Sequence, residues 1–120
     1  MNINYYKYIN KTELNKWINI IMSMEEIKTF SIQPLTNRSL NFEIIDDKKV
    51  KWYGHYRIST HCMKVNLDGH NNLGQLIDTI AHEMAHICYI SHDRSHTKQK
   101  MLFKKLIKIN IDLIMERMAA

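Results

Sequence analysis

The chain has 120 residues, of which 45% are hydrophobic and 24% are charged, and this is the composition of an ordinary globular protein. It contains only three glycines and one proline, which excludes a collagen-like or low-complexity chain. The formal net charge is +5, from 17 basic and 12 acidic side chains, and it permits a nucleic-acid partner without requiring one. At this length we expect a single domain that spans residues 1–120.

The N-terminal stretch and the cysteines bear on the location of the protein. Residues 1–9 are polar and aromatic, without the basic segment and apolar run that mark a signal peptide. Because no apolar run approaches the roughly 20 residues of a membrane helix, we expect a cytoplasmic protein with no membrane partner. Cys62 and Cys88 lack a CxxC spacing, so we expect two reduced, structural thiols and no separate zinc ribbon.

The first predicted element is an amphipathic helix over residues 12–24, with Thr12 as its N-cap. Its apolar residues recur at the spacing of one buried helix face, and they are Leu14, Trp17, Ile18, Ile21 and Met22. The Ser-Met-Glu-Glu run at residues 23–26 resembles a capping box. It predicts a short second helix that extends through Phe30 and ends before Pro34.

Between residues 39 and 68 the pattern changes to that of strands. The apolar and β-forming residues are Leu40, Phe42 and Ile44, then Val50, Trp52, Tyr53, Tyr56 and Ile58, and then Met63, Val65 and Leu67. Gly54 interrupts the second segment, which indicates a bulge or a close approach of another element. We expect three short strands in one antiparallel sheet, covered by a helix because three strands need such a cover.

The helix predicted to cover the sheet begins near Asn72, which forms a capping pair with Gln75. Its apolar stripe follows a period of 3.6 residues and consists of Leu73, Leu76, Ile77, Ile80, Ala81, Met84, Ile87 and Cys88. The opposite face carries Gln75, Thr79, His82 and His86. A final helix is predicted from about Thr97 to Met118. Its apolar residues are Leu102, Leu106, Ile109 and Leu113 on one face, with Phe103, Ile107 and Ile114 beside it.

Residues 82–86 read His-Glu-Met-Ala-His, an HExxH motif in the middle of the predicted covering helix. Side chains four residues apart lie on one helix face, so His82 and His86 can bind a single Zn²⁺. Glu83 lies between them and can reach a metal-bound water as general base. A catalytic zinc takes three protein ligands and leaves its fourth position to water, so a third ligand is required.

His92 and His96 are the candidates for the third ligand. The ten-residue spacing from His86 to His96 gives the chain room to turn and places His96 at the N-terminus of the last helix, so we favour His96 as the third ligand. His92 would need a tight reversal at the helix end, where the chain contains no glycine. A carboxylate, or no third ligand, stays as a further alternative. The histidines at positions 55, 61 and 70 are interpreted as ordinary surface residues.

Several segments together resemble the SprT-like zinc metallopeptidases, the family of the SprT/Spartan protease domain. The matching segments are Trp52-Tyr-Gly-His-Tyr-Arg57, Met63-Lys-Val-Asn-Leu67, the run from Leu76 through the HExxH motif, and Ser95-His96 ahead of a helix that contains Phe103. By this resemblance the fold is a small α+β domain of the zincin type, in which His82, His86 and His96 hold one Zn²⁺ and Glu83 is the base. The resemblance also implies a peptide substrate that lies along an edge strand at residues 63–67.

The sequence therefore predicts a zinc-dependent endopeptidase that hydrolyses peptide bonds through a metal-activated water. Its expected partner is a protein or peptide substrate, whereas DNA is weakly supported because the chain contains no recognisable DNA-binding module. One alternative is another HExxH peptidase, such as a repressor-cleaving type, and the other is a catalytically silent, metal-stabilised binding module. The intact Glu83 disfavours the silent module, because a structural site needs the histidines and not the glutamate. The oxyanion stabiliser is open among Tyr53, Tyr56, Arg57 and Tyr89.

Overall fold

The structure is a computed structural model that describes residues 10–25, 27 and 41–119. The predicted second helix lies mostly outside the described residues, as do Phe30 and Pro34. The elements are α1 (Lys11–Ser23), β1 (Asn41–Ile45), β2 (Gly54–Arg57), β3 (Cys62–Asn66), α3 (Leu73–Ala85), α4 (Arg94–Ile109) and α5 (Ile111–Ala119). The predicted α+β class is confirmed.

Helix α1 is the predicted N-terminal helix, but its N-cap is Asn10 and not Thr12. The side-chain oxygen of Asn10 accepts a hydrogen bond of 2.8 Å from the backbone N–H of Glu13, and Asn10 Nδ2 donates to Glu13 Oε1 at 2.9 Å. The first bond satisfies one backbone donor that the first turn leaves open, and the second holds the two side chains together. The predicted apolar face is buried at Leu14, Trp17, Ile18 and Ile21, and it packs against α5 and β1.

The sheet is mixed, so the prediction of one antiparallel sheet is wrong. Its strand order is β1-β3-β2, with β1 parallel and β2 antiparallel to β3. β1 and β2 do run in opposite directions, but the loop of residues 46–53 is wide enough for β3 to lie between them. The buried side chain of Asn66, at the end of β3, ties this loop down: its Nδ2 donates to the carbonyl of Asp47 and its Oδ1 accepts from the N–H of Asp47, both at 3.1 Å.

The central position of β3 also corrects the expected substrate strand. Residues 63–67 were expected to form an edge strand, yet most of them belong to β3, which is paired on both sides. Among the described strands the edges are β1 and β2. β2 is the edge strand that contacts α3.

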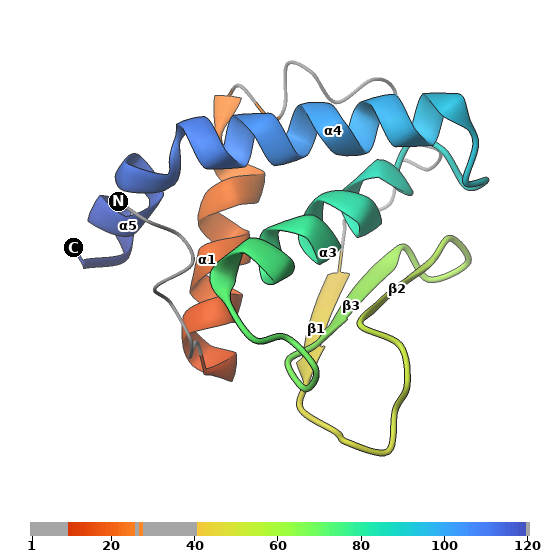
Figure 1. Cartoon of the computed structure of the whole chain (residues 1–120), viewed down its shortest axis with the longest axis horizontal. Coiled ribbons are helices and arrows are strands. Elements are labelled where there is room, and N and C mark those ends of the chain that lie inside the picture. Colours follow the sequence, from red (N-terminus) through yellow and green to blue (C-terminus); the bar gives the residue numbers. More distant parts are fainter. Residues whose placement is uncertain (1–9, 26, 28–40, 120) are drawn as a thin grey trace.

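Helix α3 begins as predicted, because the side chain of Asn72 accepts a hydrogen bond of 3.0 Å from the N–H of Gln75. Its predicted apolar stripe is buried throughout, at Leu73, Leu76, Ile77, Ile80, Ala81, Met84, Ile87 and Cys88. This stripe places α3 between α4 and the sheet (Figure 1). The polar face of α3 is thereby held at a fixed position over β2.

The C-terminal segment forms two helices and not the single predicted one, because α4 ends at Ile109 and Asn110 is its C-cap. The side-chain Nδ2 of Asn110 donates to the carbonyl of Leu106 at 2.9 Å, and such a side-chain bond competes with the backbone bonds of a continuing helix. The buried face is also not the leading one that was predicted. Ile109 and Leu113 are 66% and 39% exposed, whereas the residues predicted to lie beside that face, Phe103, Ile107 and Ile114, are buried.

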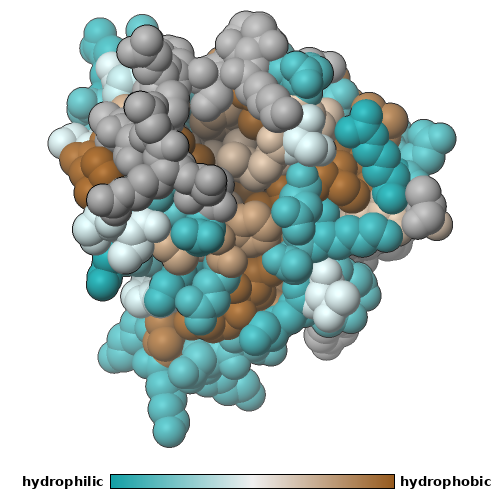
Figure 2. Space-filling view, turned by 180° about the vertical axis from the view of Figure 1, so that it is seen from behind, coloured by the Kyte–Doolittle hydropathy of each residue, from teal (hydrophilic) through white to brown (hydrophobic). Residues whose placement is uncertain are grey.

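Seen from the opposite side, hydrophilic side chains cover much of the described surface around a strip of apolar ones (Figure 2). Among the described residues, each helix is too short or too polar to cross a membrane.

Candidate metal centre and active site

Four histidines converge at the C-terminal end of α3. His82 lies in the last turn of α3, His86 is the C-cap of α3, His92 lies in the following loop, and His96 lies in the first turn of α4. The HExxH motif therefore ends the helix, and its predicted place in the middle of the helix is wrong. One ring nitrogen of each histidine lies within 4.8 Å of the others. The Nε2 atom of His92 is 3.1 Å from that of His82 and 2.9 Å from that of His86. The structure thus brings the HExxH pair together with both candidates for the third ligand.

The spacing of the four rings suits a single metal ion. The six centroid distances between them range from 4.2 to 5.1 Å. Four imidazoles arranged tetrahedrally around one ion, at the usual Zn–N distance, have centroids about 5 Å apart. The donor set is therefore compact enough to share one ion, and imidazole is a preferred ligand of zinc.

His86 is held in the tautomer that a metal requires. Its Nδ1 lies 3.0 Å from the carbonyl oxygen of Tyr89, and because a carbonyl only accepts, Nδ1 carries the proton. The lone pair is then on Nε2, the atom that faces His92. Such a bond from a ligating histidine to a backbone carbonyl is the usual means of orienting the ring.

His96 is fixed at both its backbone and its ring. Its N–H donates to the side chain of Asp93, the N-cap of α4, at 3.0 Å. This cap explains why α4 begins at Arg94, earlier than the predicted Thr97. The ring Nε2 donates to the carbonyl of His82 at 3.0 Å, which leaves the lone pair of His96 on Nδ1.

The end of α3 makes that carbonyl available. The backbone N–H of His86 turns to the carbonyl of Glu83 at 3.1 Å, in the tighter pattern common at helix ends. The carbonyl of His82 then accepts from the ring of His96. His96 therefore satisfies a helix terminus and orients itself in the same contact.

Burial keeps the histidines neutral. Together with the charges of the neighbouring His96 and His86, it lowers the pKa of His82 to about 4. Burial is also the main cause of the lowered pKa values of His86 and His96. Since a metal binds the neutral imidazole, the three lowered pKa values favour metal binding at neutral pH.

Glu83 is a buried acid with an unsatisfied oxygen. Its residue is only 4% exposed, and among the described residues Oε2 has no hydrogen-bond partner. The other oxygen, Oε1, is 3.7 Å from Nε2 of His82. Burial raises the pKa of Glu83 to about 7. This carboxyl can therefore take up and release a proton near neutral pH.

Gly54 allows β2 to lie close to Glu83. A Cβ atom at Gly54 would lie 2.8 Å from Cγ of Glu83 and 2.7 Å from Cγ2 of Thr79. The sequence left a bulge or a close approach as alternatives for this glycine, and the structure shows the close approach. The contact fixes the position of the Glu83 side chain.

Two small cavities flank Glu83 and define the space for a substrate. One has a volume of about 240 Å³ and is lined by Tyr53, Gly54, Asp78, Thr79, His82 and Glu83. The other has a volume of about 300 Å³ and extends along β2 toward the histidine cluster. Its lining includes His55, Tyr56, His86 and His92. The carboxylate thus lies between two openings on the polar face of α3.

Tyr56 and Tyr89 are candidates for the oxyanion stabiliser, and the structure shows contacts of both with the site that the sequence did not predict. The ring of Tyr56 stacks on His86 at a centroid distance of 6.4 Å, and its hydroxyl lies 2.6 Å from Nδ1 of His61. His61 is buried, so its interpretation as a surface residue is wrong. Tyr89 contributes its backbone carbonyl, which no side-chain pattern encodes.

Comparison with known proteins adds no relative. No protein-family model matches the chain. Neither curated proteins nor solved structures give a match. The function must therefore be argued from the residues of the site.

Proposed function

We propose that the protein is a zinc-dependent endopeptidase of the SprT-like, zincin type. The observation that carries the proposal is the placement of Glu83, a buried carboxyl with one unpaired oxygen beside a cluster of histidines. A structural metal site has no use for such a group, because an unpaired buried acid is destabilising. The resemblance of the HExxH helix and its flanking segments to the SprT-like family supports the same conclusion.

In this proposal His82, His86 and His96 hold the zinc ion. His86 and His96 are buried, and hydrogen bonds to backbone carbonyls orient both rings. His92 is exposed in a loop, so we leave it out of the ligand set and give the fourth position on the metal to water. Zinc bound by this set would lower the pKa of a water to about 7 and polarise the scissile carbonyl.

Glu83 moves the proton. Its Oε2 accepts a proton from the attacking water, and the resulting carboxylic acid passes it to the leaving amine. A pKa of about 7 suits both steps, because the group is easily ionised and easily protonated at neutral pH. Gly54 supports this role by leaving room for the side chain beside β2.

The substrate is proposed to be an extended peptide paired with β2. Among the described strands β2 is paired on one side only, with β3, and its residues line a cavity next to Glu83. An extended peptide can add to such an edge through backbone hydrogen bonds, which impose little sequence preference. The proposal also places the enzyme in the cytoplasm, where the thiols of Cys62 and Cys88 stay reduced.

One observation favours a second candidate, a metal-stabilised binding module. All four histidines are within reach of one ion, and a site closed by four protein ligands is typical of structural zinc. In that case removal of His92 would change stability without creating activity. In the peptidase, removal of His92 leaves a site that still cleaves.

The decisive experiment compares the wild-type protein with Glu83→Gln. We expect each to contain about one zinc ion per chain by mass spectrometry of metals. Only the wild type should cleave an unfolded protein such as reduced casein, because the amide cannot accept a proton from water. Cleavage by Glu83→Gln, or a wild type without zinc, would overturn the proposal.

A further inference from the structure

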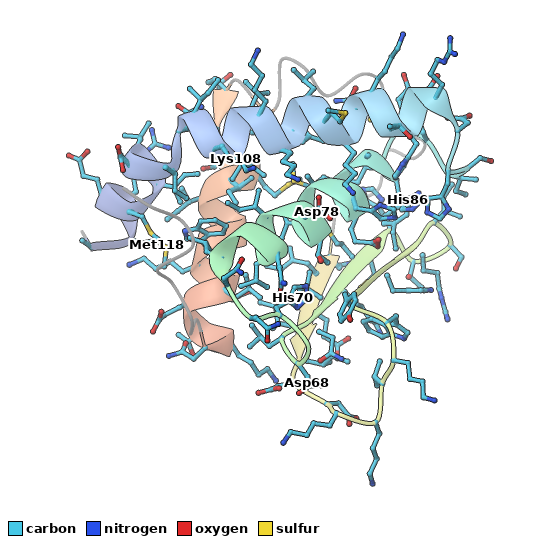
Figure 3. The ribbon with its side chains drawn as sticks, in the orientation of Figure 1. Asp68, His70, Asp78, His86, Lys108 and Met118 are labelled. Atoms are coloured by element: carbon cyan, nitrogen blue, oxygen red, sulfur yellow. The ribbon has the colours of Figure 1, made fainter. Side chains whose placement is uncertain are left out.

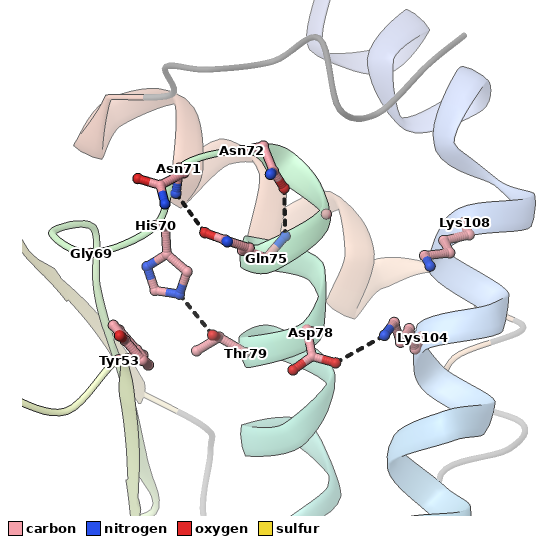
Figure 4. Close-up of a pocket in the computed structure, with 11 residues that line it drawn as sticks. Tyr53, Gly69, His70, Asn71, Asn72, Gln75, Asp78, Thr79, Lys104 and Lys108 are labelled. Carbon is pink, nitrogen blue, oxygen red and sulfur yellow. Dashed lines mark hydrogen bonds and ion pairs between the residues drawn. The ribbon is translucent and has the colours of Figure 1, made fainter.

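A third cavity opens where α3 begins, between the loop before α3 and helix α4 (Figure 4). Its volume is about 600 Å³, larger than either cavity beside Glu83. The walls come from the loop, from the polar face of α3 and from two lysines of α4, Lys104 and Lys108. The lining is thus polar and partly basic.

This cavity adjoins the proposed active site. It shares the lining residues Tyr53, Asp78 and Thr79 with the small cavity next to Glu83. The labelled side chains show the same order along α3, with His70 near its start, Asp78 in the middle and His86 at its end (Figure 3). Together the adjoining cavities form a row, the groove, along the polar face of α3.

Helix geometry gives the distance along this groove. Thr79 precedes Glu83 by one turn and Gln75 precedes it by about two, which correspond to about 6 and 12 Å along the axis. An extended peptide advances about 3.3 Å per residue. The cavity therefore lies about two to four substrate residues from the peptide bond that would be cleaved beside Glu83.

The charge of the cavity comes mainly from Lys108. Asp78 is already neutralised, because Lys104 donates to its Oδ1 at 3.0 Å and Lys100 donates to its Oδ2 at 3.2 Å. Partial burial opposes ionisation, but these bonds hold the pKa of Asp78 below its ordinary value. Lys108 points toward α3 in Figure 4 and has no ion pair with another described residue.

The opposite wall is aromatic. Tyr53 is 57% exposed, and its ring contacts the ring of His70 edge to face at a centroid distance of 5.3 Å. His70 in turn bonds to the hydroxyl of Thr79 at 2.7 Å. A Cβ atom at Gly69, whose φ is +89°, would lie 2.5 Å from the Tyr53 ring, so a glycine is needed there. The wall can pack against the aliphatic part of a bound side chain.

We propose that this cavity is a specificity subsite that binds an acidic side chain of the peptide substrate through Lys108 and Lys104. The inference rests on the proposed peptidase function. The hollow shape suits a single carboxylate on a flexible stem, and the lysine ammonium groups offer charge-assisted hydrogen bonds to it.

The first test maps the cleavage sites of the wild-type protein in unfolded proteins by mass spectrometry. We expect Asp and Glu to be enriched two to four residues to one side of the cut bond. Lys108→Glu should abolish the enrichment and shift it to Lys and Arg. The matched control is Lys105→Glu, which makes the same charge change on an exposed residue of α4 outside the cavity lining. Cleavage without acidic preference, or an equal effect of both variants, overturns the subsite.

A second test does not require activity. The binding of fluorescein-labelled decapeptides to zinc-loaded Glu83→Gln protein is measured by anisotropy. Each peptide carries either Glu or Gln at the position that the mapping identifies. If the mapping identifies none, the residue is placed in turn at each of the three positions that lie two to four residues from the bond to be cut. We expect the Glu peptide to bind at least about fivefold more tightly, and Lys108→Glu to reverse the order. If this holds but the wild type cleaves nothing, the peptidase proposal fails and the subsite stands. Equal binding of the Glu and Gln peptides overturns the subsite. It is also overturned if a short single-stranded oligonucleotide displaces the Glu peptide and no longer binds the Lys108→Glu variant.

Discussion

The buried acid Glu83 should destabilise the metal-free protein as the pH rises. Its folded-state pKa of about 7 lies above the ordinary value of 4.5, so the folded protein binds the proton more tightly than the unfolded chain. The cost is therefore absent well below pH 4.5, grows as the pH rises and is complete above pH 7. Glu83→Gln has no charge to bury and should escape this cost.

The magnitude follows from the size of the pKa shift. One pKa unit corresponds to about 1.4 kcal/mol, so the complete shift of Glu83 costs about 3 kcal/mol of unfolding free energy. At pH 5 the cost is below about 1 kcal/mol, because this pH lies only about half a unit above the ordinary pKa of 4.5 that the carboxyl has in the unfolded chain. The advantage of Glu83→Gln over the wild type should therefore grow by about 2 to 3 kcal/mol between pH 5 and pH 8.

The assay is urea unfolding followed by circular dichroism, with a chelator present at both pH values. Comparison of the two proteins cancels the titration of groups that they share. Asp78→Asn serves as the control on the same helix, because its paired carboxylate has a lowered pKa. Its removal should reduce stability at pH 8. A wild type and a Glu83→Gln variant with the same pH dependence would refute the burial of an unpaired carboxyl at this position.

The other predictions concern the metal and its neighbours. Competition with a chelator should show that His96→Ala weakens zinc binding at least about tenfold, whereas His92→Ala changes it by less than about threefold; the reverse order would assign the third ligand to His92. Gly54→Ala should retain zinc but lower kcat by about tenfold or more, because the added Cβ would lie 2.8 Å from Glu83 Cγ, and an unchanged kcat would contradict that contact. The metal-free Glu83→Gln protein should lose stability as the pH falls below 6.5 toward about 4, since the lowered pKa of His82 favours the neutral ring; a constant urea midpoint from pH 7 to pH 5 would contradict the burial of the histidines.

Helix α3 could be predicted because its sequence carries both of its determinants locally. The side chain of Asn72 caps the first turn, and the apolar stripe repeats at the helical period on the face that becomes buried. The same regularity positions His82 and His86 on the other face. The central part of the candidate site therefore follows from local sequence alone.

The sheet order could not be predicted, because it depends on a contact remote in sequence. Alternation identifies strands and their buried faces but does not say which strands are neighbours. Here Asn66 ties the loop after β1 to the end of β3, and its side chain is buried. The pattern of residues 63–67 fits a central strand as well as an edge strand. For this reason the substrate edge expected from the sequence is β3, whereas among the described strands it is β2 that has an unpaired edge and contacts α3.

The choice between His92 and His96 as the third ligand also depends on tertiary contacts. Both residues lie near enough in sequence to reach the HExxH helix, and the structure brings both within reach. They differ in what fixes them. His96 is buried, and α4 and a carbonyl at the end of α3 hold it, while His92 is exposed in the loop. Spacing in the sequence does not reveal that difference.

Glu83 is buried and partly unpaired, which is not expected of a carboxyl on the polar face of a helix, and this exception supports the functional proposal. A carboxyl on the polar face of α3 would normally reach water or a cation, yet Gly54 brings β2 against it and leaves one oxygen unpaired. Such a group persists only where the surrounding packing holds it in place. The close approach of β2 both raises the pKa of the proposed base and sets the exposed strand beside it. One glycine thus couples the protonation of the base to the position of the substrate edge.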